Sequence, residues 1–400
     1  MRVTTRLRAA FGTWLASAAL AAGAGCGDSA SPAADVNDTG KPSDVAVDAV
    51  SSAKDSVVGP ADYDAAGPWG VGIAHLAAVD VARNRSLKLT FWYPALTAGP
   101  TLACGEVYDT GAKLAQLYAE ATPTCVRQTT QAGQGVAAAP GKWPIVVFSH
   151  CSGCFRASSA SLAERLASHG IAVIAPDHAP NTIFDQWNNA FTGLSDEMLQ
   201  TRVADVRFAL DVVLDPAAPS LPAALRDHCD AAKAGVFGHS FGALTTGAAV
   251  ASDARLLAGL AIAAPLSSPF PAGPDLATVH KPLLLLLAKE DNSITELGNQ
   301  FIRDNYASAP GPAWLLEVAD AGHFSFSDVA GLQASFQPGC GDGLRQTNDK
   351  PFAYLSAATG RQTAARVTVA FFARFLLGRP DAMAALDLPF AASVTSLHKP

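Results

Sequence analysis

Short apolar runs alternate with longer helical patterns from residue 87 onward. The runs are LKLTFWYP (87–94), WPIVVFSH (143–150), GIAVIAPDH (170–178), KAGVFGHS (233–240), LAGLAIAAP (257–265), KPLLLLLAKED (281–291) and AWLLEVADAGH (313–323). Most of them lack the strict apolar–polar alternation of a half-exposed strand, and continuous apolar runs are typical of strands buried on both faces. The pattern therefore predicts a mainly parallel central sheet flanked by helices.

Three segments between or after these runs carry a helical period. Residues 157–170 place Leu162 and Leu166 four positions apart, and residues 361–380 include Gly378 as a stop signal. Residues 195–215 repeat apolar residues on one face at Val203, Val206, Leu210 and Val213. Strand–helix alternation over 66–400 predicts one α/β domain with insertions.

Two insertions interrupt this alternation, at residues 96–142 and 179–194. The second contains Phe184, Trp187 and Phe191 near the predicted carboxyl ends of the strands, where open parallel sheets bind ligands. These aromatic side chains either line a pocket or pack as an ordinary connecting loop, and the sequence leaves both alternatives open.

The N-terminus has the layout of a secretory signal peptide over residues 1–25. Arginines at positions 2, 6 and 8 precede an apolar stretch at 9–22 and then small residues, and the segment resembles a bacterial lipoprotein signal in which Cys26 is lipidated. The alternative is ordinary cleavage after Ala24, which leaves a soluble exported protein. Both alternatives predict export to the cell envelope or beyond, with a lipid anchor to the membrane in the first.

Residues 26–65 are predicted to be a disordered acidic linker. Residues 27–65 contain eight Asp and two Lys, a net charge of −6, and almost no large apolar residue. A segment of this composition cannot bury enough apolar surface to order itself. The linker would hold the domain at 66–400 away from a membrane surface.

Charge and ligand patterns exclude several classes of partner. The formal net charge is −7, with no run of lysine or arginine, which argues against a nucleic-acid surface. No His-x-x-x-His spacing or complete Cys/His set is present, so neither a metal nor another cofactor is expected. The oligomeric state is not indicated.

Six cysteines follow the predicted signal, and an even number in an exported chain favours disulfides. They are Cys104, Cys125, Cys151, Cys154, Cys229 and Cys340. Cys104 with Cys125 is the preferred pair, because both lie in the insertion at 96–142. The Cys-Ser-Gly-Cys spacing at 151–154 follows a strand, so a thioredoxin-like redox motif is the alternative for that pair.

The segment VFGHSFGALTTG (236–247) places one serine between two glycines at the end of an apolar run. Gly238, Ser240 and Gly242 fit the Gly-x-Ser-x-Gly pattern, and a small-residue helix follows. A serine at such a sharp strand-to-helix corner has a strained backbone that pushes its oxygen out above the sheet, and the flanking residues are small because the two backbones approach closely. Ser240 is therefore the candidate nucleophile.

A nucleophilic serine needs a base and an acid that orients the base. Three histidines follow Ser240, namely His280, His323 and His398. His280 precedes a strand and lies at the wrong end of the sheet, and His398 lies in a C-terminus that we expect to be frayed. His323 ends the last apolar run and is the predicted base.

The acid should follow the strand between serine and histidine. The run PLLLLLAKED ends in Glu290 and Asp291. Asp291 is preferred because it begins the loop, and Glu290 is the alternative.

Acyl transfer also needs donors for the oxyanion. One is predicted to be the backbone N–H of Phe241, next after the nucleophile. The other is predicted to come from the loop FSHCSGCFR (148–156), from the N–H of Ser152 or alternatively that of Cys151.

The motifs together resemble the serine α/β-hydrolases grouped with platelet-activating factor acetylhydrolase and the dienelactone-hydrolase-like esterases. The matching segments are GPWGVG (67–72), DVARNRSLKLTFWYPA (80–95), VVFSHCSGCFR (146–156), LASHGIAVIAPDH (166–178), GHSFG (238–242) and GHFSFSD (322–328). The resemblance implies a triad of Ser240, Asp291 and His323, with Ser152 and Phe241 as oxyanion donors.

The chain departs from the family's pattern at two places. Cys151 stands where the family has glycine, and Val329 and Ala330 stand where related secreted members have a cysteine paired with one like Cys340. A serine nucleophile, unlike the cysteine of dienelactone hydrolases, favours ordinary carboxylic esters.

The sequence thus predicts a serine ester hydrolase that acts on a small-molecule ester or lipid, with short-chain acyl or phospholipid acetyl-type esters as substrates. One alternative is an amidase, peptidase or polyester depolymerase, because the same triad serves any acyl transfer. Another is a non-catalytic surface lipoprotein that binds a ligand on the same fold.

Overall fold

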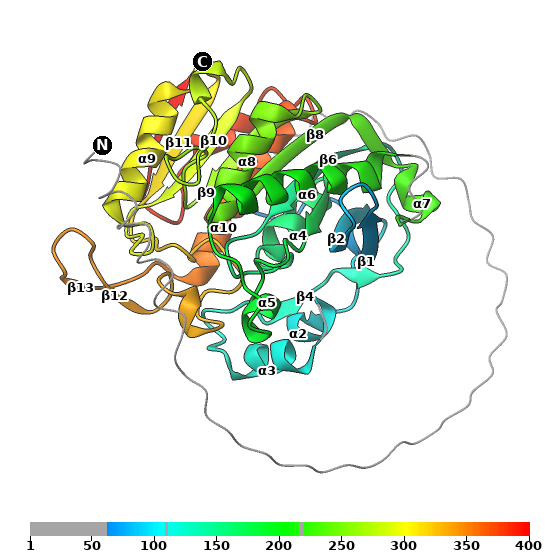
Figure 1. Ribbon diagram of the computed structural model, residues 1–400, viewed down its shortest axis with the longest axis horizontal. Helices are drawn as coiled ribbons and strands as arrows, with labels where there is room; N and C mark the ends of the chain where they lie inside the picture. Colours follow the sequence, from blue (N-terminus) through cyan, green and yellow to red (C-terminus); the bar gives the residue numbers. More distant parts are fainter. Residues whose placement is uncertain (1–61, 109–110, 216–219) are drawn as a thin grey trace, which may run out of the picture.

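A ten-stranded sheet forms the centre of the molecule (Figure 1). The computed structural model describes residues 62–108, 111–215 and 220–400. The sheet has the strand order β14-β11-β10-β9-β8-β6-β7-β2-β1-β5. Its strands are β1 (Gly70–Asp80), β2 (Arg85–Ala95), β5 (Gly133–Gln134), β6 (Trp143–Ser149), β7 (Ala172–Pro176), β8 (Cys229–His239), β9 (Leu256–Ile262), β10 (Leu283–Ala288), β11 (Ala313–Val318) and β14 (Val394–Lys399).

All seven apolar runs of the sequence form strands of this sheet. The neighbours from β7 through β6, β8, β9 and β10 to β11 are parallel, whereas β1, β2 and β14 join by antiparallel pairs. Every residue of β6 and of β10 is buried, as expected for strands covered on both faces. The predicted α/β fold with a mainly parallel sheet is confirmed.

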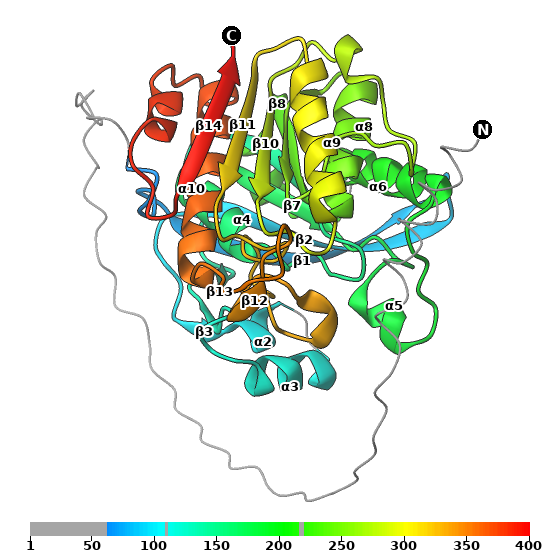
Figure 2. The same cartoon turned by 90° about the vertical axis from the view of Figure 1, so that its left-hand side faces the viewer.

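Helices cover both faces of the sheet (Figure 2). Helices α4 (Ala160–Ser168) and α10 (Ala357–Phe375) contact each other on one face. Helices α6 (Asp196–Leu214), α8 (Phe241–Ser252) and α9 (Thr295–Ser308) cover the other. A separate apolar core therefore fills the space on each side of the sheet.

The two insertions meet at one end of the molecule, where α2, α3 and α5 lie together in Figure 1. The first insertion contains β3 (Leu102–Ala103), α2 (Cys104–Val107), α3 (Ala112–Glu120) and β4 (Thr129–Thr130), and the second contains α5 (Ile183–Trp187). The ammonium of Lys113 on α3 lies 4.7 Å from the ring centroid of Trp187 on α5. The remaining short elements are α7 (Ala223–Arg226), the hairpin of β12 (Asp342–Leu344) and β13 (Pro351–Ala353), and 3-10 turns at Leu276–Thr278, Ala334–Phe336 and Ala382–Leu386.

Both ends of the predicted domain are corrected by the structure. The C-terminus is not frayed, because β14 pairs antiparallel with β11 and places His398 opposite Trp314. Residues 62–65, predicted to belong to the linker, pack onto the domain: Tyr63 is buried, and Arg165 donates to the carbonyl of Asp64 at 2.5 Å. The folded part therefore begins by residue 62 rather than at 66.

The predicted signal peptide, Cys26 and the linker up to residue 61 lie outside the described residues, so they stay predictions. Within the ranges that the structure describes, no helix has the length and apolar character needed to cross a membrane.

Candidate active site

Ser240 lies at the corner between β8 and α8, in a backbone conformation that side chains rarely adopt. Its φ is 57° and its ψ is −120°. A Cβ on Gly242 would stand 1.8 Å from the carbonyl oxygen of Ser149, and a Cβ on Gly238 would stand 2.0 Å from that of Gly242. The strain and the two glycines expected from the sequence are therefore present, and the close approach of backbones explains why both flanking residues lack side chains.

Asp291 and His323 meet beyond the ends of β10 and β11. The Nδ1 atom of His323 donates a hydrogen bond to Oδ2 of Asp291 at 2.7 Å, and both side chains are buried. The other carboxylate oxygen of Asp291 accepts the backbone N–H of Ser293 at 3.0 Å and that of Ile294 at 3.1 Å. These contacts hold the carboxylate in one orientation, and they leave Nε2 as the ring atom of His323 that can accept a proton.

The alternative acid, Glu290, points to a different partner. Its carboxylate pairs with Nη1 of Arg345 at 2.8 Å and accepts the backbone N–H of Gln346 at 3.0 Å. Of the two acidic residues at the end of β10, the structure brings Asp291 and not Glu290 to His323.

His239, the residue before Ser240, contacts His323 directly. Its Nε2–H donates to the carbonyl oxygen of His323 at 2.7 Å, and the two ring centroids lie 4.9 Å apart. Burial, followed by the charge of His323, lowers the pKa of His239 to about 3, so its ring is neutral near pH 7. The end of β8 and the loop after β11 are therefore joined beside Ser240. By contrast His280 is exposed ahead of β10, at the other end of that strand.

The predicted oxyanion loop follows β6 and is fixed by hydrogen bonds. The Gly153 N–H donates to the carbonyl of Asn181 at 3.1 Å, and the Cys154 N–H donates to that of Cys151 at 3.2 Å. The amides of Cys151 and Ser152 remain the candidates in this loop. The Oγ of Ser152 accepts a hydrogen bond from Nδ2 of Asn181 at 2.9 Å. Phe241, which carries the other predicted donor, is the first residue of α8, where helical N–H groups lack intrahelical partners.

The aromatic insertion packs against this loop. The rings of Phe155 and Phe184 meet edge to face with centroids 5.9 Å apart, and Phe184 and Trp187 meet in the same way at 5.5 Å. The Ile183 N–H donates to the carbonyl of Cys154 at 2.9 Å. The insertion thus supports the oxyanion loop from outside.

The disulfides differ from the preferred pairing of Cys104 with Cys125. The structure joins Cys125 to Cys340 and Cys151 to Cys154, while Cys104 and Cys229 are buried free thiols. The Cβ of Cys125 lies 3.6 Å from the point where a Cβ on Gly331 would stand. Cys125, from the first insertion, therefore lies close to Val329 and Ala330. It pairs with Cys340 in place of the cysteine that related secreted proteins have near those two positions.

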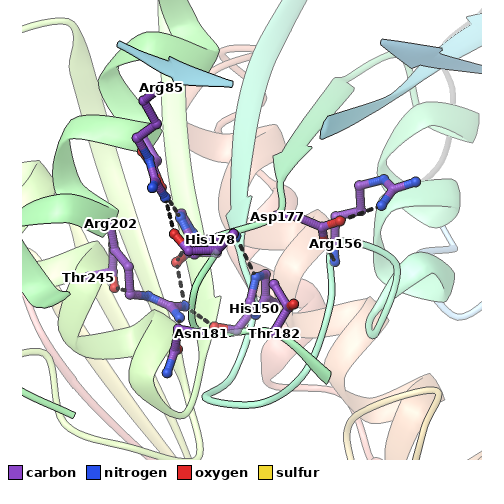
Figure 3. Close-up of polar contacts among 12 residues, drawn as sticks. Arg85, His150, Arg156, Asp177, His178, Asn181, Thr182, Arg202 and Thr245 are labelled. Carbon is purple, nitrogen blue, oxygen red and sulfur yellow. Dashed lines mark hydrogen bonds and ion pairs between the residues drawn. The ribbon is translucent and has the colours of Figure 1, made fainter. Parts of the chain in front are cut away.

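Sequence reasoning missed a buried polar network beneath the oxyanion loop (Figure 3). Its members include Arg202 and Asp205 on α6 and His178 and Asn181 after β7, all without exposed surface. A signal was present, because Arg202 and Asp205 are spaced three apart beside apolar residues of the buried face of α6. Charged residues on such a face need buried partners, so their presence in the sequence indicates a buried polar network.

Comparisons with known proteins show what part of the chain is similar to. The family model described as "Platelet-activating factor acetylhydrolase, isoform II" matches residues 64–184, which include β1, β2, β6 and the oxyanion loop. The bovine (Bos taurus) platelet-activating factor acetylhydrolase is 27% identical over 179 residues, which is 36% of this chain and 40% of the bovine protein. The dog (Canis lupus familiaris) protein of the same name is 29% identical over 154 residues, 30% of this chain and 35% of its own length. The chain thus spans less than half the length of these curated relatives.

A solved structure extends the similarity to most of the chain. A ferulic acid esterase from Streptomyces cinnamoneus superposes with a TM-score of 0.60 at 25% sequence identity. The match covers 82% of this chain and 96% of the esterase. The chain therefore has an α/β-hydrolase fold, and it is similar over residues 64–184 to the family described as platelet-activating factor acetylhydrolase, isoform II.

Proposed function

We propose that this protein is a serine ester hydrolase that cleaves carboxylic esters through an acyl-enzyme intermediate. The observation that supports this most is the buried 2.7 Å hydrogen bond from His323 to Asp291, beside a serine with φ of 57°. The relatives carry the names of an acetylhydrolase and an esterase, which supports ester hydrolysis as the reaction.

In the proposed mechanism, Ser240 Oγ attacks the ester carbonyl carbon while Nε2 of His323 takes the hydroxyl proton. Asp291 holds the imidazole in the tautomer that leaves Nε2 free to accept, and its negative charge stabilises the imidazolium that forms. The backbone N–H groups of Phe241 and Ser152 donate to the oxyanion. His323 then passes the proton to the departing alcohol as the C–O bond breaks.

Deacylation repeats these steps with water as the nucleophile. His323 takes a proton from water, the hydroxide adds to the acyl carbon, and the proton returns to Ser240 as its oxygen leaves. Since only 4% of the surface of residue Ser240 is exposed, we propose that short acyl groups such as acetyl are preferred. An acyl-length series of p-nitrophenyl esters tests this preference.

The proposal predicts that Ser240→Ala lowers kcat/KM for p-nitrophenyl acetate by roughly 10⁴- to 10⁶-fold, because nothing else supplies the nucleophile. Asp291→Asn should lower it by about 10³- to 10⁴-fold, since the imidazole loses its orienting charge. Glu290→Gln is the matched control and should stay within about threefold of the native enzyme, because Glu290 binds Arg345 instead.

A fluorophosphonate probe provides an independent measurement. Labelling should be found on the peptide that contains Ser240 and should be absent in Ser240→Ala. A folded protein that is not labelled would refute the proposal and favour a ligand-binding role. Near-native turnover of Ser240→Ala would refute Ser240 as the nucleophile. Faster turnover of amides than of matched esters would instead favour the amidase alternative.

A further inference from the structure

Arg202 is wholly buried and connects the two sides of the proposed oxyanion hole. Its Nη1 donates to Oδ1 of Asn181 at 2.6 Å, and its Nη2 donates to the backbone carbonyl of His150. On the other side its Nε donates to Oγ1 of Thr245 at 3.1 Å, and the guanidinium carbon lies 4.6 Å from the ring centroid of Phe241. Figure 3 shows the side chain reaching from α6 between these segments.

The contact with His150 acts on the oxyanion loop through the peptide plane. The carbonyl of His150 and the N–H of Cys151 belong to one peptide unit, and in a trans peptide they point in opposite directions. A guanidinium that holds the carbonyl therefore also fixes the direction of the Cys151 N–H. The ring of His150 strengthens this link: its Nε2 accepts the backbone N–H of His178 at 3.0 Å, so Nδ1 carries the proton that is donated to the Cys151 carbonyl at 2.7 Å.

The contact with Asn181 acts on Ser152. Because Arg202 has only donors, it requires the oxygen of the Asn181 amide to face it, and this leaves the NH₂ group to face Ser152 Oγ at 2.9 Å. The Asn181 backbone carbonyl accepts the Gly153 N–H at the same place. Arg202 thus determines the orientation of the side-chain amide that holds Ser152, next to the point where the Asn181 backbone holds Gly153.

A second layer holds Arg202 itself. Ser149 accepts from Nη2 of Arg202 at 3.2 Å and lies 3.0 Å from Nε2 of His178, whose Nδ1 lies 3.0 Å from Asp205. Burial, followed by the charge of Arg202, lowers the pKa of His178 to about 3. A neutral ring with its proton on Nδ1 donates to Asp205 and accepts from the Ser149 hydroxyl, so the oxygen of Ser149 is oriented toward Arg202.

This serine–histidine–aspartate chain has the connectivity of a catalytic triad, but its three side chains have no exposed surface. No substrate reaches Ser149 in this arrangement. Burial tends to raise the pKa of Asp205, yet hydrogen bonds from His178 and Arg85 outweigh it and hold the value at about 2. The chain is a rigid buried support beneath the oxyanion loop.

We propose that Arg202 is a positioning residue that holds the amides of the Cys151–Ser152 loop and of Phe241 at the separation that the oxyanion requires. This inference rests on the proposed ester hydrolase function. In the proposed mechanism Arg202 contacts no reacting atom. Its loss should therefore raise the energy of the transition state, in which the oxyanion develops, more than it weakens binding of the ester.

The test replaces Arg202 by Lys, which keeps the charge but not the fork of donors, and by Met, which keeps the length. Both variants should lower kcat for p-nitrophenyl acetate by about 10- to 100-fold with KM changed less than about threefold, since one poorly aimed donor costs up to about 10²- to 10³-fold. Affinity for a trifluoromethyl ketone, which forms a tetrahedral adduct with the serine, should fall by the same factor as kcat/KM.

Arg366 provides a matched control for the loss of a buried arginine. It is 97% covered, donates to the backbone carbonyls of Ala385, Leu388 and Pro389, and lies 4.2 Å from the ring centroid of Phe390. Its contacts lie on the C-terminal segment and on Asp64 instead of the oxyanion loop. Arg366→Lys should lower the melting temperature but leave kcat and ketone affinity within about twofold.

Asn181→Ala keeps the proposal falsifiable if the Arg202 variants do not fold, because it breaks the same chain one step closer to Ser152. It should also lower kcat and ketone affinity together. Folded Arg202 or Asn181 variants that keep native kcat and ketone affinity, measured beside an inactive Ser240→Ala, overturn the positioning role alone. Native activity in Ser240→Ala overturns the proposed function and with it this inference.

Discussion

His178 and His239 are two histidines whose local environment differs strongly from that of an exposed side chain. Both are buried next to the site, and burial lowers the pKa of each to about 3 from an ordinary value of 6.5. Their neutral rings can each donate through one nitrogen, and these donors hold Asp205 and the carbonyl of His323. Their neutrality is therefore part of how the site is built.

This neutrality predicts that stability falls as the pH is lowered from about 6.5. Between pH 6.5 and 3 the unfolded chain binds protons on these histidines that the folded chain does not bind, so the free energy of unfolding rises with pH in that window. At pH 5 the loss is roughly 2 kcal/mol for each histidine. Urea unfolding at pH 7.5 and at pH 5 measures it.

His239→Asn should reduce this pH dependence, whereas the same change at exposed His280 should leave it unaltered. Equal stability of the native protein at the two pH values would contradict the assignment of both rings as buried and neutral.

At the scale of elements, the site depends on how closely α8 approaches β6. Four segments contribute: the loop after β6, the corner after β8, and the loops after β10 and β11. The parallel strands end at the same edge of the sheet, so residues far apart in sequence meet there. The Gly-x-Ser-x-Gly pattern predicted the corner, where Gly238 meets the nearby carbonyl of Gly242 and Gly242 meets that of Ser149 on β6.

The close approach predicts that Gly242→Ala is strongly destabilising. The new Cβ would stand 1.8 Å from the Ser149 carbonyl oxygen, and a backbone atom cannot move away as a flexible side chain can. The helix must shift, which should cost at least about 2 kcal/mol of folding stability and displace Ser240 and Phe241 together. Thermal unfolding and kcat for p-nitrophenyl acetate measure the two effects.

Gly111→Ala is the control, because a Cβ at Gly111 meets nothing within 4 Å and its φ of −96° suits any residue. Native-like stability and turnover of Gly242→Ala would show that the strand and helix backbones are not held at this distance.

At the scale of the whole molecule, the Cys125–Cys340 disulfide links the first insertion to the segment after His323. The two cysteines are separated by 215 residues, and their Cα atoms lie 5.7 Å apart. Arg361 on α10 also donates to the carbonyl of Cys125 at 2.9 Å. The insertion is thus attached both to the segment that follows His323 and to α10.

Removing this bond in a Cys125→Ser/Cys340→Ser variant should lower the free energy of unfolding by about 2–5 kcal/mol, because the cross-link restricts a long loop of the unfolded chain. Cys151→Ser/Cys154→Ser should lower it by less, because that bond closes a span of only three residues. Urea unfolding of both variants compares them. An equal effect of the two changes would mean that loop closure is not the source of the stability.

The sequence alone determined the features that depend on local chemistry. Continuous apolar runs specify buried strands, the Gly-x-Ser-x-Gly pattern marks the corner at Ser240, and elimination among three histidines indicated His323, with Asp291 preferred to Glu290 as the acid. Only the tertiary structure decided the features that depend on distances between remote segments: the pairing of Cys125 with Cys340, the pairing of β14 with β11, and the contacts of Arg202. A buried charge is stable only where polar groups from several segments surround it. No local sequence pattern specifies which remote segments come together in this way.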